Sequence, residues 1–112
     1  MDHLVPETTG AAEPAEGVRI AYMTSGDRVS AQHFEIEPGA VVPEHDHHHE
    51  QLGFVYEGEL RFFFDGTELD VAAGEGFFIP GGEPHAAENV GDTVVRGIDV
   101  FAPARSADYW SE

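Results

Sequence analysis

The chain has 112 residues, 41% of them hydrophobic, which is enough for one compact domain and too few for two. It carries 22 acidic residues against five basic ones, so its formal charge of −17 excludes binding to bare nucleic acid or to an anionic membrane, since both are polyanions. No apolar run approaches the roughly 20 residues that span a bilayer, and the absence of cysteine removes disulfides and thiolate chemistry. Because lysine is also absent, the acidic excess predicts a halophilic protein, in which high salt screens the self-repulsion.

The N-terminal residues have neither the basic nor the apolar region of a signal peptide, so we expect a cytoplasmic location. Residues 1–17 are rich in Gly, Ala, Pro and Glu and predict a flexible acidic arm. Residues 18–112 then predict a single β-domain.

From residue 18 onward, short runs rich in β-branched and aromatic residues are separated by glycine and proline turns. No window shows a sustained 3.6-residue hydrophobic period, so no substantial helix is expected. The expected strands cover residues 18–23, 28–37, 51–56, 59–64, 67–72, 76–80, 84–89 and 93–101. Short strands at this spacing are typical of a jelly roll or a small barrel, and the predicted fold class is all-β.

Histidines gather in one segment and recur in a second. His45 and His47 lie two residues apart, so on an extended segment they project from the same face. Taken alone, the run DHHHE is equally compatible with a solvated histidine-rich loop. The second segment, residues 74–89, is rich in glycine and proline and presents His85 from a different strand, which favours a metal site built from both segments.

The spacing of these residues resembles the two motifs of the cupin superfamily. The first motif corresponds to Gly39, His45, His47, Gln51 and Gly58, with every interval kept. The second corresponds to Gly74, Pro80, Gly82, His85 and Asn89. The resemblance implies a double-stranded β-helix, or jelly-roll barrel, that holds one divalent metal ion inside the barrel.

The resemblance implies a metal-ligand set of His45, His47, Gln51 and His85. Cupins usually carry glutamate where this chain has Gln51, and Glu50 lies beside it. Glu50 would break the motif spacing, and neighbouring residues of a strand face opposite ways, so Gln51 is the expected fourth ligand. Nitrogen and oxygen donors without sulfur suit Zn, Ni, Fe, Mn or Co. Four neutral ligands would leave the ion more electropositive, which favours an anionic substrate.

The C-terminal run contributes three further candidates. Asp99 and Phe101 share a strand face, so Asp99 is either exposed to solvent or aimed at the barrel interior. In the first case Arg105 would cap the loop after Pro103. In the second, Asp99 would be a general acid or base near the metal, Arg105 would hold a substrate carboxylate, and Phe101 would stack on a sugar ring.

Asp99, Phe101 and Arg105, following the His, His, Gln, His pattern, resemble the KdgF-type cupins of pectin and alginate breakdown. That resemblance implies an enzyme that linearises 4,5-unsaturated uronates, with Asp99, Phe101 and Arg105 as catalytic residues. Two alternatives stay open at this point: a metal-dependent dioxygenase, and a non-catalytic cupin that binds a small ligand or a metal. As small cupins commonly pair through their outer sheets, a homodimer is expected, with the N-terminal arm adding a strand across the interface.

Overall fold

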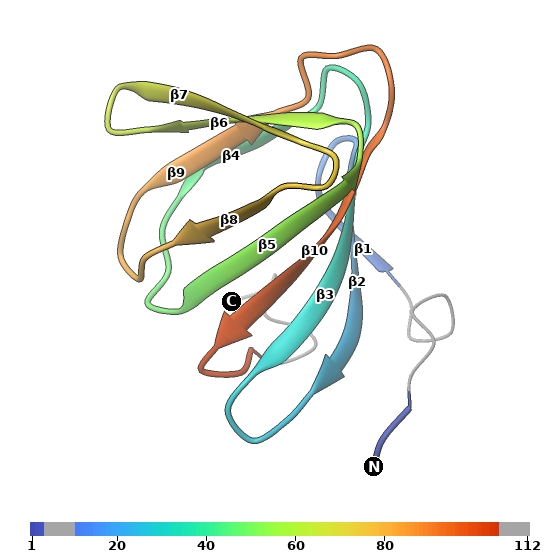
Figure 1. Ribbon diagram of the computed structural model, residues 1–112, viewed down its shortest axis with the longest axis vertical. Helices are drawn as coiled ribbons and strands as arrows, with labels where there is room; N and C mark the ends of the chain where they lie inside the picture. The colour runs from blue at the N-terminus through green and yellow to red at the C-terminus, as the bar shows by residue number, and fades with distance from the viewer. Residues whose placement is uncertain (4–10, 106–112) are drawn as a thin grey trace.

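The computed structural model describes residues 1–3 and 11–105, and within them it has ten strands and no helix (Figure 1). Accordingly, the described part of the chain offers no helix long and apolar enough to cross a membrane. The strands are β1 Ala11–Ala15, β2 Val18–Ser25, β3 Ser30–Ile36, β4 Val41–His45, β5 Glu50–Glu57, β6 Glu59–Phe64, β7 Thr67–Ala72, β8 Gly76–Ile79, β9 His85–Glu88 and β10 Val95–Ala102.

Two antiparallel sheets form the barrel. The larger has the order β1-β2-β3-β10-β5-β8 and the smaller the order β4-β9-β6-β7, as the ribbon in Figure 1 shows. Buried apolar side chains from both sheets form one core: Val18, Phe34, Ile36, Val55 and Val95 with Ile79 from the larger, and Leu60, Phe62, Val71 and Ala87 from the smaller. The all-β jelly-roll prediction is confirmed.

The larger sheet follows the two-residue alternation of a half-buried strand. Along β3 and β10 buried and half-buried residues alternate without interruption. The inward row of β3 begins with Ser30 and Gln32, and that of β10 ends with Asp99 and Phe101. Polar residues therefore lie on the inner face near one end of each strand, while the other end is apolar.

Two glycines make room for aromatic rings inside the barrel. A Cβ added at Gly53 would lie 1.9 Å from the ring of Phe77, and one added at Gly97 would lie 2.3 Å from the ring of Phe34. Both distances are far below a van der Waals contact, so only glycine allows the rings to pack at these positions.

The sequence did not predict β1 and β4. Each is an edge strand that contains a proline, Pro14 or Pro43, and in each the pairing register shifts at that proline. Proline is tolerated at sheet edges and bulges because it has no N–H to donate to a neighbouring strand. β1 pairs with β2 of the same chain, so residues 11–15, expected to belong to a flexible arm, form a strand of the barrel. Residues 4–10 of that predicted arm lie outside the described part of the chain.

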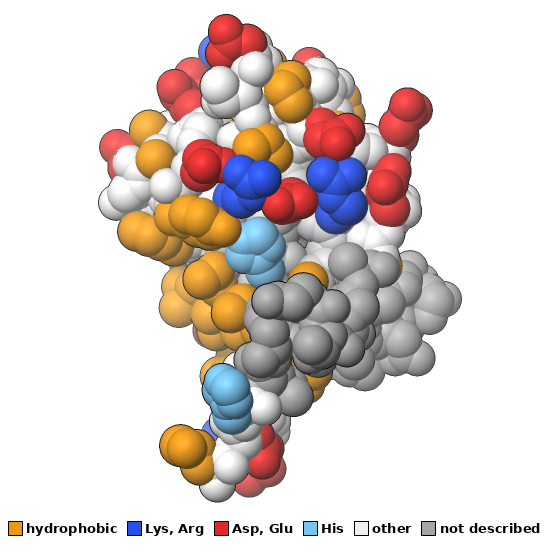
Figure 2. Space-filling view, turned by 90° about the vertical axis from the view of Figure 1, so that its right-hand side faces the viewer, with side chains coloured by type: hydrophobic (Ala, Val, Ile, Leu, Met, Phe, Trp, Pro, Cys, Tyr) orange, Lys and Arg blue, Asp and Glu red, His pale blue; other side chains and the backbone are white. Residues whose placement is uncertain are grey.

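The outer face of the larger sheet divides into a charged row and an apolar area. Arg19 and Arg96 both pair with Glu35, and Arg96 also pairs with Glu57, which makes a row of ion pairs across four strands. Figure 2 shows such a row of alternating basic and acidic side chains, with hydrophobic side chains gathered beside it. The exposed apolar side chains of β5 and β8 on this face are Leu52, Phe54, Tyr56 and Phe78, each 47–55% exposed.

Candidate metal centre

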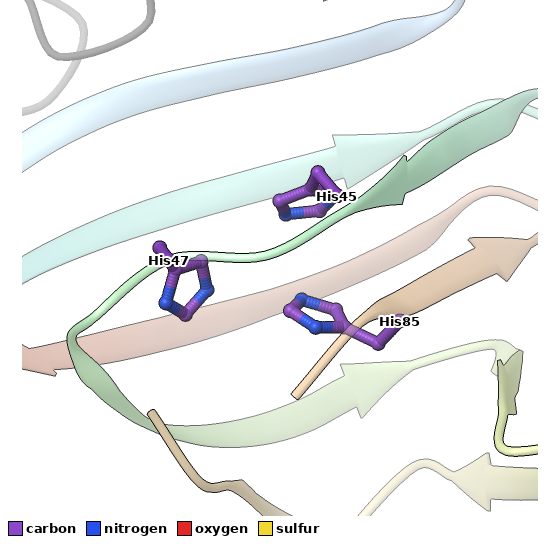
Figure 3. Close-up of side chains that lie close together, drawn as sticks. All are labelled: His45, His47 and His85. Carbon is purple, nitrogen blue, oxygen red and sulfur yellow. The ribbon is translucent and has the colours of Figure 1, made fainter. Parts of the chain in front are cut away.

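Three histidines from separate parts of the smaller sheet and its loops converge on one point. His45 ends β4, His85 begins β9 directly opposite it, and His47 lies in the loop that leads into β5. One ring nitrogen from each lies within 4.8 Å of the other two. Figure 3 shows the three rings turned toward one another. The structure thus brings together the histidines that the two sequence motifs predicted.

Each of these histidines is oriented through its Nδ1 atom, which lies within hydrogen-bond distance of a backbone carbonyl oxygen. A carbonyl oxygen only accepts, so Nδ1 carries the proton and Nε2 keeps its lone pair. Burial also lowers the pKa of His47 and His85, which favours the neutral, ligating form. The carbonyls belong to Pro43 for His45, His49 for His47 and Glu83 for His85, at 2.9, 3.0 and 2.8 Å. Histidine ligands in metal sites are commonly held in this way.

Gln51 supplies an oxygen to the same point. Its Oε1 lies 3.1 Å from Nε2 of His47, and its side chain is buried, whereas Glu50 is exposed. With the proton of His47 on Nδ1, two lone pairs face each other across that distance, an arrangement that a cation between them would satisfy. Three imidazole nitrogens and one amide oxygen form a donor set that fits a divalent ion such as Zn, Ni, Fe, Mn or Co.

Asp99 lies next to this donor set and is only 6% exposed. Its Oδ1 accepts a hydrogen bond from Nε2 of Gln51 and its Oδ2 accepts one from Nε2 of Gln32, both at 3.0 Å. Burial raises the pKa of Asp99 to about 6, although the two hydrogen bonds and the charge of Arg105 oppose the increase. The alternative in which Asp99 faces solvent is therefore wrong.

Phe101 and Arg105 close one side of the site. The Phe101 side chain is buried, and the guanidinium of Arg105 lies over its ring, 4.5 Å from the centroid. The Phe101 ring also meets the ring of His47 edge to face at 5.7 Å. The backbone N–H of Arg105 donates to Oγ of Ser30 at 2.8 Å, which ties the segment after β10 to the start of β3. Because Arg105 covers one face of Phe101, only the rest of that ring remains available to a ligand.

A cavity of about 410 Å³ reaches these groups. Gln51, His85, Asp99 and Arg105 line it together with His45, and apolar side chains from both sheets form most of the remaining wall. In the strand register Gln32 pairs with Asp99, Phe34 with Gly97 and Ile36 with Val95, so the polar layer is followed by apolar ones. The cavity therefore combines a polar, metal-binding end with an apolar interior.

Gln32 is the site residue that our sequence analysis missed. It lies on the inward face of β3, in the same row as Phe34 and Ile36, and is 5% exposed. A polar residue in the inward row of an otherwise apolar strand was the signal that would have found it.

The cupin domain family model matches residues 32–101, and the chain belongs to this family. Among curated proteins, the HTH-type transcriptional regulator PuuR of Escherichia coli (strain K12) is 30% identical over 93 residues, which are 80% of this chain and 50% of that protein. PuuR of Shigella flexneri matches equally. The chain spans about half the length of these curated relatives.

Several solved structures share the fold. KdgF from Halomonas sp. superposes with a TM-score of 0.84 at 21% identity, covering 95% of this chain and 96% of that one. An RmlC-like cupin from Shewanella frigidimarina gives 0.82 at 29% identity, covering 95% of each chain. The polyketide cyclase RemF from Streptomyces resistomycificus gives 0.81 at 23% identity, covering 99% of this chain and 91% of that one. These proteins differ in function, so the chemistry of this chain has to be argued from its own site.

Proposed function

We propose that this cupin is a metal-dependent enzyme that linearises a 4,5-unsaturated uronate, a small anionic sugar. The observation that carries the proposal is the position of Asp99. It is a buried carboxyl with a raised pKa, hydrogen-bonded to Gln51 and lining the same cavity as His45, His85 and Arg105. One cavity therefore combines a group that can carry a proton (Asp99), a cation that can bind a substrate carboxylate (Arg105) and histidines that can hold a metal.

The reaction is an isomerisation that needs no co-reactant. The hydroxyl on C1 loses a proton, the bond between C1 and the ring oxygen breaks, and C4 gains a proton as the resulting enol becomes a ketone. A divalent ion held by His45, His47, His85 and Gln51 would supply Lewis-acid polarisation of a substrate oxygen. Asp99 accepts and returns the proton, a role that a pKa near neutrality suits. Arg105 binds the substrate carboxylate, because a guanidinium can donate two parallel hydrogen bonds to the two oxygens of a carboxylate.

The test follows the ultraviolet absorbance of the conjugated enol ether in a single turnover. Substrates would be the unsaturated monouronates derived from pectin and from alginate, with metal-loaded protein in molar salt and metal-free protein as the control. We expect metal-dependent loss of absorbance, and its abolition in Asp99→Ala and Arg105→Ala when both variants are assayed at saturating metal. Folded, metal-loaded protein that leaves both substrates unchanged would refute the proposal.

A ligand-binding role without catalysis is the second candidate, and the match to PuuR favours it. In that case this cupin would be the sensor domain of a regulator and its cavity would bind the ligand. The DNA-binding domain would lie on another chain or segment. Calorimetry together with the absorbance assay separates the two candidates. A sensor would give a heat of binding with a small anion and leave the anion chemically unchanged, whereas an enzyme would convert it. The dioxygenase alternative is tested in the same preparation by oxygen consumption with ferrous ion. Turnover under strict anaerobiosis excludes it.

The apolar area on the outer sheet supports a homodimer as the assembly. Leu52 and Phe78 are paired in register, and Phe54 and Tyr56 continue the row, so four large apolar side chains form one exposed patch. A second copy of the chain would cover this patch. Light scattering should give the dimer mass for the wild type, and Phe54→Glu should yield a monomer. A wild-type monomer at micromolar concentration would contradict the assembly.

Two further proposals concern the protein's surroundings: a cytoplasmic location and a halophilic source. The charge of −17 supports the second, because self-repulsion weakens as salt rises. Thermal unfolding between 0.1 and 2 M KCl checks it, and a melting temperature that does not rise with salt would count against it.

A further inference from the structure

Gln51 presents a problem of orientation that its packing cannot solve. The oxygen and the NH₂ group of a side-chain amide have nearly the same shape, so a buried glutamine fits its site equally well in either rotation. Only the rotation with Oε1 toward Nε2 of His47 offers a lone pair to a metal. The opposite rotation would place an N–H donor there and remove the fourth ligand.

The hydrogen bonds on the other side of Gln51 select the rotation. Nε2 of Gln51 donates to Oδ1 of Asp99, and Nε2 of Gln32 donates to Oδ2, each at 3.0 Å. A carboxylate only accepts, so it requires an N–H from both glutamines. Since Asp99 receives the NH₂ group of Gln51, the oxygen of that amide must point to the histidines.

The three residues also lie on adjacent strands of one sheet. Gln32 of β3 is directly opposite Asp99 of β10, and Gln51 of β5 is opposite Phe101, two residues farther along β10. All three side chains are at most 8% exposed, so water does not compete effectively for their hydrogen bonds. The row is thus held by the backbone ladders and not by a mobile loop.

We propose that Gln32 and Asp99 are positioning residues that fix the amide of Gln51 with its oxygen toward the metal centre. This inference rests on the metal centre of the proposed function, and it is independent of the substrate. It also explains how a glutamine can serve where a cupin usually has a glutamate: the carboxylate stands one hydrogen bond behind the ligand and orients it. Partners behind metal ligands commonly act in this way.

Asp99→Asn removes the requirement for an N–H from both glutamines, because an asparagine side chain has one accepting oxygen and one donating NH₂ group in place of two accepting oxygens. The NH₂ group of Gln51 then has no obligatory partner, and we expect metal affinity to fall by about 10- to 100-fold, as is typical for such partners. The double variant Gln32→Glu with Asp99→Asn restores this requirement for Gln51 from the other end. The new carboxylate on β3 holds the asparagine NH₂, whose oxygen must then face Gln51.

The measurement is the dissociation constant for Zn²⁺ and for Ni²⁺, by competition with a chromophoric chelator at pH 7.5. Circular dichroism checks that each variant is folded, and Gln32→Glu alone completes the double-mutant cycle. We expect Asp99→Asn to bind weakly and the double variant to return to within about threefold of the wild type, since total charge and hydrogen-bond number are conserved.

Two results would overturn the inference. Folded Asp99→Asn with wild-type affinity would show that Asp99 does not orient the ligand, and a double variant as weak as Asp99→Asn would show that amide polarity is not what matters. Both results leave the proposed function standing, because the wild type still binds metal. A wild type that binds neither ion would overturn the inference and the proposed function together.

Discussion

Asp99 makes the stability of the metal-free protein depend on pH in a direction opposite to that of most carboxylates. Its pKa rises from 3.8 to about 6 on folding, because burial penalises the charged form. The folded state therefore holds the proton more tightly than the unfolded state, and stability is lost as the pH rises from about 4 to about 6. A difference of about two pH units at 1.36 kcal/mol each corresponds to about 3 kcal/mol.

The perturbation that isolates this effect is Asp99→Asn, which cannot ionise. Any cost of mismatched amides is the same at every pH, so it shifts the difference between the two proteins without changing its slope. Burial also lowers the pKa of His33, His47 and His85, which makes stability rise with pH toward 6.5. Since both proteins share these histidines, subtraction removes their contribution to a first approximation.

The assay is urea unfolding of chelator-treated protein at several pH values between 4.5 and 7.5, in 1 M salt. The free energy of unfolding of the wild type, minus that of Asp99→Asn, should fall by about 2 kcal/mol over this range, the part of the full effect that lies above pH 4.5. A difference that stays constant to within about 0.5 kcal/mol would refute the reasoning. A pKa shift of even one unit on folding would change the free energy of unfolding by about 1.4 kcal/mol over this range.

Three other predictions concern the scaffold. Gly53→Ala should destabilise the protein by about 1–3 kcal/mol, because its Cβ would overlap the Phe77 ring; a change below 0.5 kcal/mol in denaturant unfolding would show that the ring moves aside. Asn89→Ala should cost about 2–4 kcal/mol, since the buried amide donates to the carbonyls of Ile36 and Thr93; an unchanged melting temperature would contradict this. Arg96→Ala should change stability by less than about 1 kcal/mol despite its two ion pairs, because both pairs lie on the outer face and remain partly open to solvent; a larger loss in thermal unfolding would show a cooperative charge network.

Most strands were predictable because their patterns are local. The predicted ranges 59–64 and 67–72 coincide with β6 and β7, and the Asp65-Gly66 turn between them has both residues at positive φ. β1 and β4 were missed because their prolines and short length hide the alternation. Both strands lie at sheet edges, and an edge exists only once its neighbour has formed.

The positions of the histidines and of Asp99 were also within reach of the sequence. Motif spacing placed His45, His47 and His85 together, and strand parity put Asp99 on the same face as Phe101. The alternation along the strand did not decide whether the face that carries Asp99 and Phe101 points to the core or to solvent, because either face of a strand can meet the core. The burial of Asp99 settled it.

The sequence by itself determined the opposed facing of Glu50 and Gln51, which depends on spacing along one strand, and the all-β class, which depends on the local pattern of each short segment. Its two motifs also predicted the histidine cluster. The tertiary structure decided the contacts between distant segments: the Gln32–Asp99–Gln51 row, the hydrogen bond from the Arg105 backbone to Ser30, and the ring of Phe77 on Gly53. The physical reason is that such contacts join residues up to 75 positions apart, whose meeting depends on sheet order and register. Periodicity fixes which way a side chain faces, and only the folded sheet fixes what it faces.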